Sequence, residues 1–241
     1  MPTAAQETDQ TREWTGSFGK EYTERNTFTP AELDALYDRN YGITRRALNL
    51  RFLGDLSKCA RILEVGCNVG NQLLVLQEMG FTNLFGIEIQ SYALERARSR
   101  VPDTKFTQAS VLAIPYPDQN FDLVFTSGVL IHIAPPNVPV ALAEIHRCAK
   151  TWVWGSEYYA PRMTEVSYRG HNSLLWKTDY AQLYVERFPD LELVSEQRLR
   201  YLENENVDTM FLLRRRSDLV GSKAGARRYP CLRFRQHLRR A

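Results

Sequence analysis

Two carboxylates stand at the ends of two neighbouring apolar segments of this chain. Glu64 lies in the segment "RILEV", and Glu88 ends the segment "FGIE", 22 residues after Gly66. At that distance a carboxylate on the next strand of a parallel sheet can accept both hydroxyls of a ribose. The pair therefore predicts a nucleoside ligand at the carboxyl ends of two adjacent strands.

A glycine-bearing turn, "GCNVG", follows Glu64 and leads into a second apolar segment. Gly66 and Gly70 let the backbone approach a ligand closely, and the free N–H groups of the following helix then face that ligand. Asn68 stands where a second glycine is usual, and asparagine tolerates a left-handed backbone. The spacing differs from the dinucleotide pattern G-x-G-x-x-G. A tight turn without any ligand is the alternative at this point.

Glu64 indicates which nucleoside would bind. A carboxylate inside the end of a strand is costly to bury unless a cation or a hydrogen-bond donor satisfies it. The pyrophosphate of a dinucleotide is a poor partner for such an acid, whereas a ligand with an ammonium and a sulfonium group is a good one. Glu64 therefore favours S-adenosylmethionine over NAD as the cofactor.

Candidates for acceptor chemistry lie in the loops expected after the fourth and fifth strands, where a parallel sheet binds its ligands. His132 has an ordinary pKa that suits proton removal at neutral pH, with a histidine satisfied by backbone as the alternative. His171 lies in a polar loop, "YRGH". Tyr158 or Tyr159 can present a ring to a sulfonium, but adjacent strand residues point to opposite sides, so one of them faces the cleft.

Segments of strand length alternate with segments of helical period around these residues, which is typical of a parallel sheet covered by helices. The expected strands are 61–65, 83–89, 105–110, 121–128, 151–158, 191–202 and 206–215. The expected helices are 71–80, 91–100, 137–150 and 179–188, two of them capped by Ser91 and Asp179, with one or two more within 29–56.

The last two strands have only the short link 203–206 between them. Strands joined so tightly must pair antiparallel, because a parallel pair needs a crossover of a dozen or more residues. The predicted fold class is α/β, a doubly wound, mostly parallel seven-stranded sheet that ends in an antiparallel hairpin. We expect a disordered segment over 1–12, one domain over 13–213 with a helical cap over 13–58, and a tail from 214.

The net charge of +3 is unevenly distributed along the chain. Residues 214–241 hold ten Lys and Arg and one Asp, so they carry +9 and leave −6 for residues 1–213. An acidic body argues against a nucleic-acid substrate, because phosphate binding needs a clustered basic surface. The tail has dense like charge and no regular period, which predicts disorder; contact of this basic arm with RNA or a membrane is the alternative.

Composition sets two further expectations. The four cysteines are widely spaced without a C-x-x-C pair, so we expect neither a metal site nor a disulfide framework. No window of the chain approaches the length of a membrane span, and the first residues contain no apolar secretion segment. These features predict a cytoplasmic protein.

The segments "ILEVGCNVG", "GIEIQ" and "FDLVFTSGVLIHI" resemble those of class I S-adenosylmethionine-dependent methyltransferases, which have a Rossmann-like fold. More narrowly, "EWTGSFGKEYTERN", "EVGCNVGNQL", "FTSGVLIHI", "LLWKTDYA" and "NVDTMFLL" resemble the bacterial methyltransferase group named for its association with pseudaminic-acid biosynthesis. The likeness extends from about Glu13 to Leu213 and leaves out the basic tail.

The resemblance implies that Gly66, Asn68 and Gly70 line the methionine and ribose, and that Glu88 holds the ribose hydroxyls. It implies a role for further residues: Ile89 on the adenine, Ser110 and Val111 at the adenine edge, Ser127 at the methionine ammonium, and Arg45 or Arg46 at the methionine carboxylate. Ser110 departs from the aspartate that is common in the family.

The leading hypothesis is methyl transfer to a small polar acceptor, with a nonulosonic sugar or its nucleotide form suggested by the name of the narrower group. A base is needed only if the acceptor is a hydroxyl or a protonated amine. A second hypothesis is cyclisation of S-adenosylmethionine itself to azetidine-2-carboxylate and methylthioadenosine. A third is a cofactor-binding partner protein without catalysis. The oligomeric state stays open.

Overall fold

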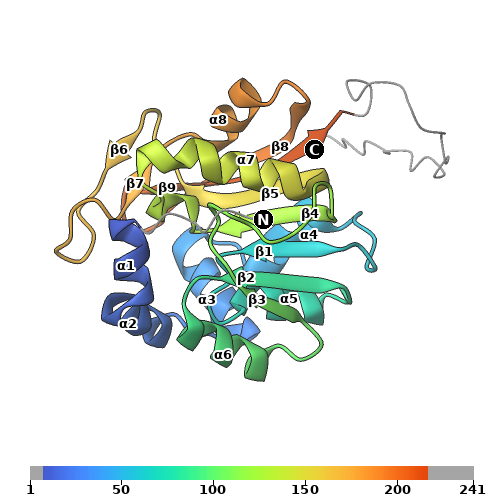
Figure 1. Cartoon of the computed structure of the whole chain (residues 1–241), viewed down its shortest axis with the longest axis horizontal. Coiled ribbons are helices and arrows are strands. Elements are labelled where there is room, and N and C mark those ends of the chain that lie inside the picture. Colours follow the sequence, from blue (N-terminus) through green and yellow to red (C-terminus); the bar gives the residue numbers. More distant parts are fainter. Residues whose placement is uncertain (1–7, 217–241) are drawn as a thin grey trace.

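A seven-stranded sheet forms the centre of the molecule in a computed structural model that describes residues 8–216 (Figure 1). Its strand order is β3-β2-β1-β4-β5-β9-β8, and β9 alone runs opposite to the other six strands. The strands are β1 (Ile62–Val65), β2 (Leu84–Glu88), β3 (Lys105–Gln108), β4 (Phe121–Ser127), β5 (Ala149–Tyr158), β8 (Leu191–Arg200) and β9 (Val207–Arg215). The predicted fold class is confirmed, including the terminal hairpin.

Helices cover both faces of this sheet. They are α1 (Asp9–Thr15), α2 (Ser17–Arg25), α3 (Pro30–Tyr41), α4 (Arg45–Leu53), α5 (Asn71–Glu78), α6 (Ser91–Arg100), α7 (Val138–Cys148) and α8 (Tyr180–Arg187), with short 3₁₀ turns η1 (Leu130–His132) and η2 (Pro135–Asn137). Asp179 caps α8 through the backbone N–H of Gln182, as predicted. The Ser91 cap was wrong, because Gln90 is the N-cap of α6 and Ser91 is the first helical residue.

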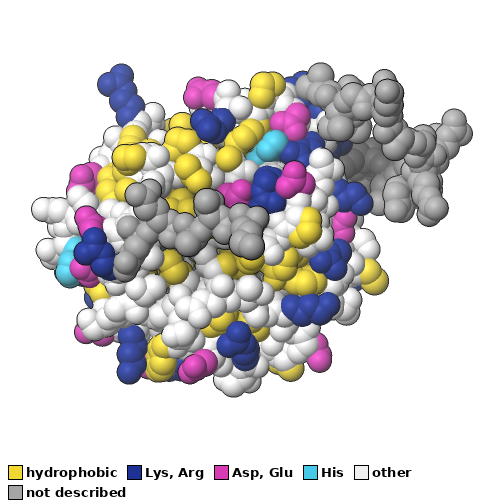
Figure 2. Space-filling model, viewed as in Figure 1, with side chains coloured by type: hydrophobic (Ala, Val, Ile, Leu, Met, Phe, Trp, Pro, Cys, Tyr) yellow, Lys and Arg dark blue, Asp and Glu magenta, His cyan; other side chains and the backbone are white. Residues whose placement is uncertain are grey.

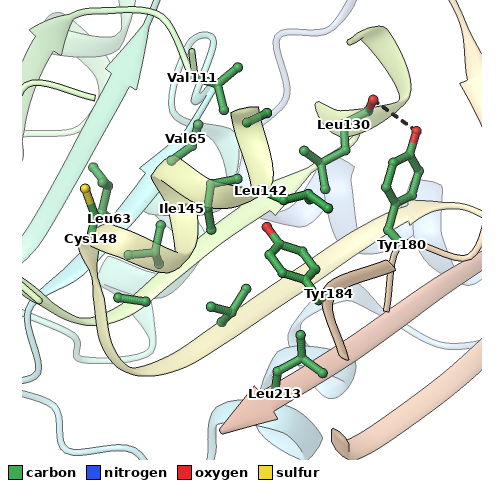
Figure 3. Close-up of a cluster of buried hydrophobic side chains, with 14 of the residues drawn as sticks. Leu63, Val65, Val111, Leu130, Leu142, Ile145, Cys148, Tyr180, Tyr184 and Leu213 are labelled. Atoms are coloured by element: carbon green, nitrogen blue, oxygen red, sulfur yellow. Dashed lines mark hydrogen bonds between the residues drawn. The ribbon is translucent and has the colours of Figure 1, made fainter. Parts of the chain in front are cut away.

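The alternation of side chains along each strand divides the core in two. One face carries Leu63 and Val153 against α7 and α8, with Leu142 and Tyr184 among the helix residues (Figure 3). The hydroxyl of Tyr180 donates to the carbonyl of Leu130 at 3.0 Å and so ties α8 to the loop that follows β4. The opposite face packs against α4 and α5; its members include Leu48, Leu73, Phe125, Trp154 and Met210.

The described chain is more ordered at its ends than we predicted. Residues 9–12 belong to α1, so the expected disorder over 1–12 is wrong for this part, and residues 1–7 lie outside the described range. At the other end, Arg214 and Arg215 belong to β9 and pair with Glu192 and Asp190 of the β8 side. The basic tail therefore begins after the sheet, and residues 217–241 lie outside the described range.

A short excursion between β5 and α8 was not predicted. It contains the two-stranded ribbon β6 (Thr164–Glu165) and β7 (Trp176–Lys177), which lies beside α1 and α2 at one edge of the molecule (Figure 1). On the face shown in Figure 2, basic and acidic side chains are interspersed. Within residues 8–216, no helix has the length and apolar character required to cross a membrane.

Candidate functional site

A cavity of about 370 Å³ lies at the carboxyl edge of the sheet, beneath α1, α2 and α3. This volume is within the range of small-molecule sites. Ten of the predicted site residues line it: Glu64, Gly66, Asn68, Glu88, Ile89, Ser110, Val111, Ser127, His132 and Tyr158. The structure thus brings together residues that are spread over five strands and the loops that follow them.

Glu88 is held in one orientation at the end of β2. Its Oε2 atom accepts the N–H of Asn68 at 2.8 Å, and its Oε1 atom accepts the N–H groups of Ile89 at 2.8 Å and Gln90 at 2.9 Å. Burial raises the pKa of this carboxyl, and the three N–H groups offset part of that rise. The two N–H groups use both lone pairs of Oε1, whereas Oε2 keeps one lone pair for a ligand hydroxyl.

The turn after β1 has the left-handed backbone that its sequence predicted. Gly66, Asn68 and Gly70 have φ of 71°, 46° and 76°. A Cβ at Gly66 would lie 2.7 Å from a methyl of Val129, so this position requires glycine for space as well as for backbone angle. Gly70 differs from the other two, because it caps α5 and is not among the cavity-lining residues.

Glu64 on the cavity wall and Arg45 behind it form a buried pair of opposite charge. Glu64 is 3% exposed, and its Oε2 atom has no hydrogen-bond partner among the described residues. Burial raises its pKa well above the usual value, and the Arg45 guanidinium offsets part of that rise. Arg45 is fully buried and donates to Asn49 at 2.9 Å and to the hydroxyl of Tyr37 at 2.7 Å, while its Nη2 atom has no described partner.

These unpartnered atoms fit the head group of an amino acid. A buried polar atom without a partner costs free energy, and a bound ligand with complementary groups removes that cost. An ammonium complements the Glu64 carboxylate, which lines the cavity. Arg45 is fully buried and is not among the cavity-lining residues, so its role at the methionine carboxylate stays a prediction. Arg46, the other candidate, pairs with Glu78 at 2.6 Å and with Asp34 instead.

His132 is 9% exposed and lines the cavity from η1. Its Nδ1 atom lies 2.7 Å from the carbonyl oxygen of Leu174, so Nδ1 carries the proton and Nε2 is the unprotonated nitrogen. The ring lies against Trp14 with centroids 4.4 Å apart. Burial lowers its pKa to about 4. The backbone satisfies one ring nitrogen, as one of the two sequence alternatives expected, and the role of the other nitrogen as a base stays a prediction.

A buried acid that the sequence analysis missed holds η1 in place. The carboxylate of Glu157 accepts the N–H of Val129 at 3.0 Å and also those of Leu130 and Ile131 in the same turn. Burial raises its pKa to about 7. Because η1 carries His132, Glu157 is a positioning residue for the cavity wall.

The remaining acceptor candidates, Tyr158, Tyr159 and His171, lie in different places. Tyr158 lines the cavity, whereas Tyr159 lies under the guanidinium of Arg198, 3.4 Å from its ring centroid. His171 does not line the cavity: it is exposed near the ribbon and lies edge-on to Phe18 with centroids 5.1 Å apart. His171 is therefore not among the residues that the structure brings together at the cavity, and its catalytic role stays a prediction.

Several cavity residues come from segments to which the sequence analysis assigned no site role. Gln90 links the sheet edge to the N-terminal helices, donating to the carbonyl of Trp14 at 3.0 Å and accepting from the hydroxyl of Thr23 at 3.1 Å. Tyr41 and Asp208 meet from opposite ends of the chain. The one local signal for Asp208 was an acid at the start of an otherwise apolar strand, "VDTMFLL".

Strand order, terminal hairpin and a cavity beyond the strand ends define the Rossmann-like fold of class I methyltransferases. Residues 63–151 match the family model for a methyltransferase domain. Trans-aconitate 2-methyltransferase of Rhizobium rhizogenes is 34% identical over 87 residues, covering 36% of this chain and 34% of that protein. Sterol 24-C-methyltransferase erg6 of Schizosaccharomyces pombe is 26% identical over 142 residues, 52% of this chain and 37% of that protein. The matched region is thus about a third of each relative's length.

Two solved structures show the same fold over most of the chain. The 1,6-didemethyltoxoflavin-N1-methyltransferase of Burkholderia thailandensis, with bound 1,6-didemethyltoxoflavin and S-adenosylhomocysteine, has a TM-score of 0.63 at 15% identity. It covers 90% of this chain and 94% of that one. The [4+2]-cyclase SpnF has a TM-score of 0.57 at 14% identity and covers 78% and 96%. The second protein is named a cyclase, so a shared fold alone does not decide the reaction.

Proposed function

We propose that this protein is an S-adenosylmethionine-dependent methyltransferase that acts on a small polar acceptor. The observation that carries this proposal is the pair of buried acids on the cavity wall, Glu64 with an unpartnered oxygen and Glu88 with a fixed orientation. Together they complement an amino-acid head group joined to a ribose. The methyltransferase-domain match over 63–151 includes both acids and the glycine turn, which supports the same cofactor.

Each cofactor-site residue has a defined part in this proposal. Glu88 accepts the ribose hydroxyls, and Gly66 and Asn68 supply a close backbone surface. Ile89, Ser110 and Val111 line the adenine end of the cavity. When bound, S-adenosylmethionine supplies an electrophilic methyl group on a sulfonium sulfur. The backbone carbonyl of Ser127 and the carboxylate of Glu64 receive the ammonium, and the charge of Arg45, which lies behind the wall, attracts the cofactor carboxylate without a contact.

His132 is the base in this proposal. Its Nε2 atom takes a proton from an acceptor hydroxyl or ammonium, while Nδ1 keeps its proton on the Leu174 carbonyl. Trp14 and Glu157 hold the ring and the turn that carries it. Tyr158 adds an aromatic wall on the acceptor side.

The acceptor class is a small polar molecule, and a nonulosonic sugar or its nucleotide form is one member suggested by the sequence resemblance. Cyclisation of the cofactor and cofactor binding without catalysis are the competing hypotheses for the same cavity. Neither has a feature of the cavity that favours it over methyl transfer.

Calorimetric titration with S-adenosylhomocysteine tests the cofactor assignment. We expect binding by the full chain, and we expect Glu88→Gln to weaken it by roughly 1.5–3 kcal/mol, the range for a hydrogen bond to a charged group. Glu95→Gln on the exposed side of α6 is the matched control and should leave the affinity unchanged. Binding of NAD with no binding of S-adenosylhomocysteine would contradict the proposal.

A further inference from the structure

Four tyrosines surround a buried acid at the end of the cavity away from Glu88. We define this Asp208 arm by its members: Tyr37, Tyr41, Tyr158, Tyr201 and Asp208, all of which line the cavity. The hydroxyl of Tyr41 donates to Asp208 Oδ2 at 2.6 Å, and that of Tyr201 reaches the same oxygen at 3.3 Å. The Tyr41 ring lies 5.2 Å from Tyr37 and 4.8 Å from Tyr201, centroid to centroid.

The other carboxylate oxygen of Asp208 is unused. Asp208 is 8% exposed, and its Oδ1 atom has no hydrogen-bond partner among the described residues. Leaving a buried carboxylate oxygen unpaired is unfavourable. The hydroxyls of Tyr41 and Tyr201 contact only the other oxygen, Oδ2. Because Asp208 lines the cavity, this oxygen is a binding position for a hydrogen-bond donor or a cation that packs against the side chain.

The backbone of Asp208 lies well across the sheet from that of Glu64. The register pairs Asp208 of β9 with Tyr158 of β5, and β5 is separated from β1 by β4. Three strand spacings of about 4.8 Å place β9 about 14 Å from β1 across the sheet. Asp208 therefore belongs to a second ligand, which in a methyltransferase is the acceptor.

The charge of the cavity wall indicates what kind of acceptor fits. Its described lining holds three acids, Glu64, Glu88 and Asp208, and includes neither Lys nor Arg. Arg45 lies behind the wall and faces Glu64, while Lys177 donates to Asn206 and sits 5.3 Å from the Tyr158 ring. Both cations also act on Asp208 and reduce its excess negative charge without pairing with Oδ1.

We propose that the Asp208 arm binds a cationic amino group of the acceptor, with Oδ1 accepting its N–H and the rings of Tyr41 and Tyr201 packing around the charge. The inference rests on the proposed function, because that function makes the second ligand an acceptor. It disfavours acceptors that carry a carboxylate or phosphates at this end, and so disfavours an acidic sugar or its nucleotide form.

The test uses three fragments of equal length that differ in head group: butylammonium, 1-butanol and butyrate. Each is titrated into the full chain saturated with S-adenosylhomocysteine, and binding is measured by ligand-observed NMR. We expect butylammonium to bind at least about 10-fold more tightly than the other two, which corresponds to about 1.4 kcal/mol. Equal binding of butanol, or tighter binding of butyrate, would overturn the inference.

Two variants locate the fragment. Asp208→Asn should weaken butylammonium at least about 10-fold, whereas Asp55→Asn, the same charge change at an exposed turn, should not. Tyr201→Ala removes one ring and should weaken butylammonium by roughly 2- to 5-fold, which keeps the test available if Asp208→Asn does not fold. Unchanged butylammonium binding in a folded Asp208→Asn protein would sink the assignment.

The two proposals fail in different ways. If the wild-type protein does not bind S-adenosylhomocysteine in the first titration, the proposed function fails. If S-adenosylhomocysteine binds but butylammonium shows no preference, the amine subsite fails and the cofactor assignment stands.

Discussion

The surroundings of a single residue, His132, determine which nitrogen in the cavity can accept a proton. The Nδ1 atom of His132 donates to the carbonyl of Leu174, and burial lowers the pKa of the ring to about 4. The neutral ring is therefore present throughout the neutral pH range, and the unprotonated Nε2 atom needs no prior loss of a proton. A lower pKa also makes His132 a weaker base, so it suits an acceptor whose own proton is easily lost.

Two separate histidine variants test the role of His132 as a base. His132→Ala should lower the acceptor-dependent rate by ~10²–10⁴, the usual effect of losing a general base, while S-adenosylhomocysteine affinity is kept. His171→Ala is the control, since that side chain is exposed away from the cavity. With a pKa of about 4, the His132 base should cause the rate to fall only below about pH 5. An equal loss of rate in both variants would contradict the assignment.

Among the strands and turns, the features that depend on a few neighbouring residues could be predicted from the sequence. The apolar segments ending in Glu64 and Glu88 proved to be adjacent parallel strands, and the short link 203–206 forced the antiparallel hairpin of β8 and β9. Asn68 has the left-handed backbone that its place in the turn predicted. These features follow from steric rules that act over a few residues.

Contacts between distant segments were not predictable in the same way. Tyr41 and Asp208 lie 167 positions apart in the sequence, and no local period links them. The loop that carries His171 looked functional because it is polar, yet the β6–β7 ribbon turns it outward. Glu157 was hidden inside an ordinary strand pattern, and only the packed structure shows the N–H groups that it accepts.

The raised pKa of Glu157, the buried acid that accepts the N–H groups of η1, predicts how the stability of the fold depends on pH. Burial raises the pKa of Glu157 from 4.5 to about 7, so the folded protein keeps this proton in a range where the unfolded chain releases it. Its contribution to stability is full below about pH 4.5 and is lost as the pH rises to about 7. At about 1.4 kcal/mol per pKa unit, the change is about 3 kcal/mol.

Glu157→Gln has no proton to release, so thermal unfolding curves between pH 5 and pH 7.5 should show a flatter dependence of Tm on pH than the wild type. Glu95→Gln, an exposed control, should keep the wild-type slope. A Glu157→Gln protein with the wild-type slope would show that this carboxyl does not titrate in the folded state as described.

At the scale of the whole molecule, the cavity needs segments from both ends of the domain. Trp14 and Tyr41 come from the N-terminal helices, and Asp208 comes from the last strand. The sheet closes with Arg215, which donates to Asp190 at 2.7 Å. The described residues of the cavity wall lie between Thr8 and Asp208.

Truncation after Arg216 should therefore leave the Tm and the S-adenosylhomocysteine affinity nearly unchanged. The cut must follow Arg216 rather than Arg214, because removing Arg215 would break its ion pair with Asp190. A truncation after Leu213 is the contrasting variant and should lower the Tm. Loss of cofactor binding in the protein truncated after Arg216 would show that residues beyond 216 are part of the site.

The central claim, methyl transfer to a second substrate, is tested most directly by identifying the adenosine product. The full chain is incubated with S-adenosylmethionine, with and without a panel of small amines, and the products are separated by liquid chromatography with mass detection. We expect S-adenosylhomocysteine to form only when an amine is present. It should form in equal amount to a methylated form of that amine. Steady release of methylthioadenosine from the cofactor alone, at a rate that no added acceptor changes, would contradict it.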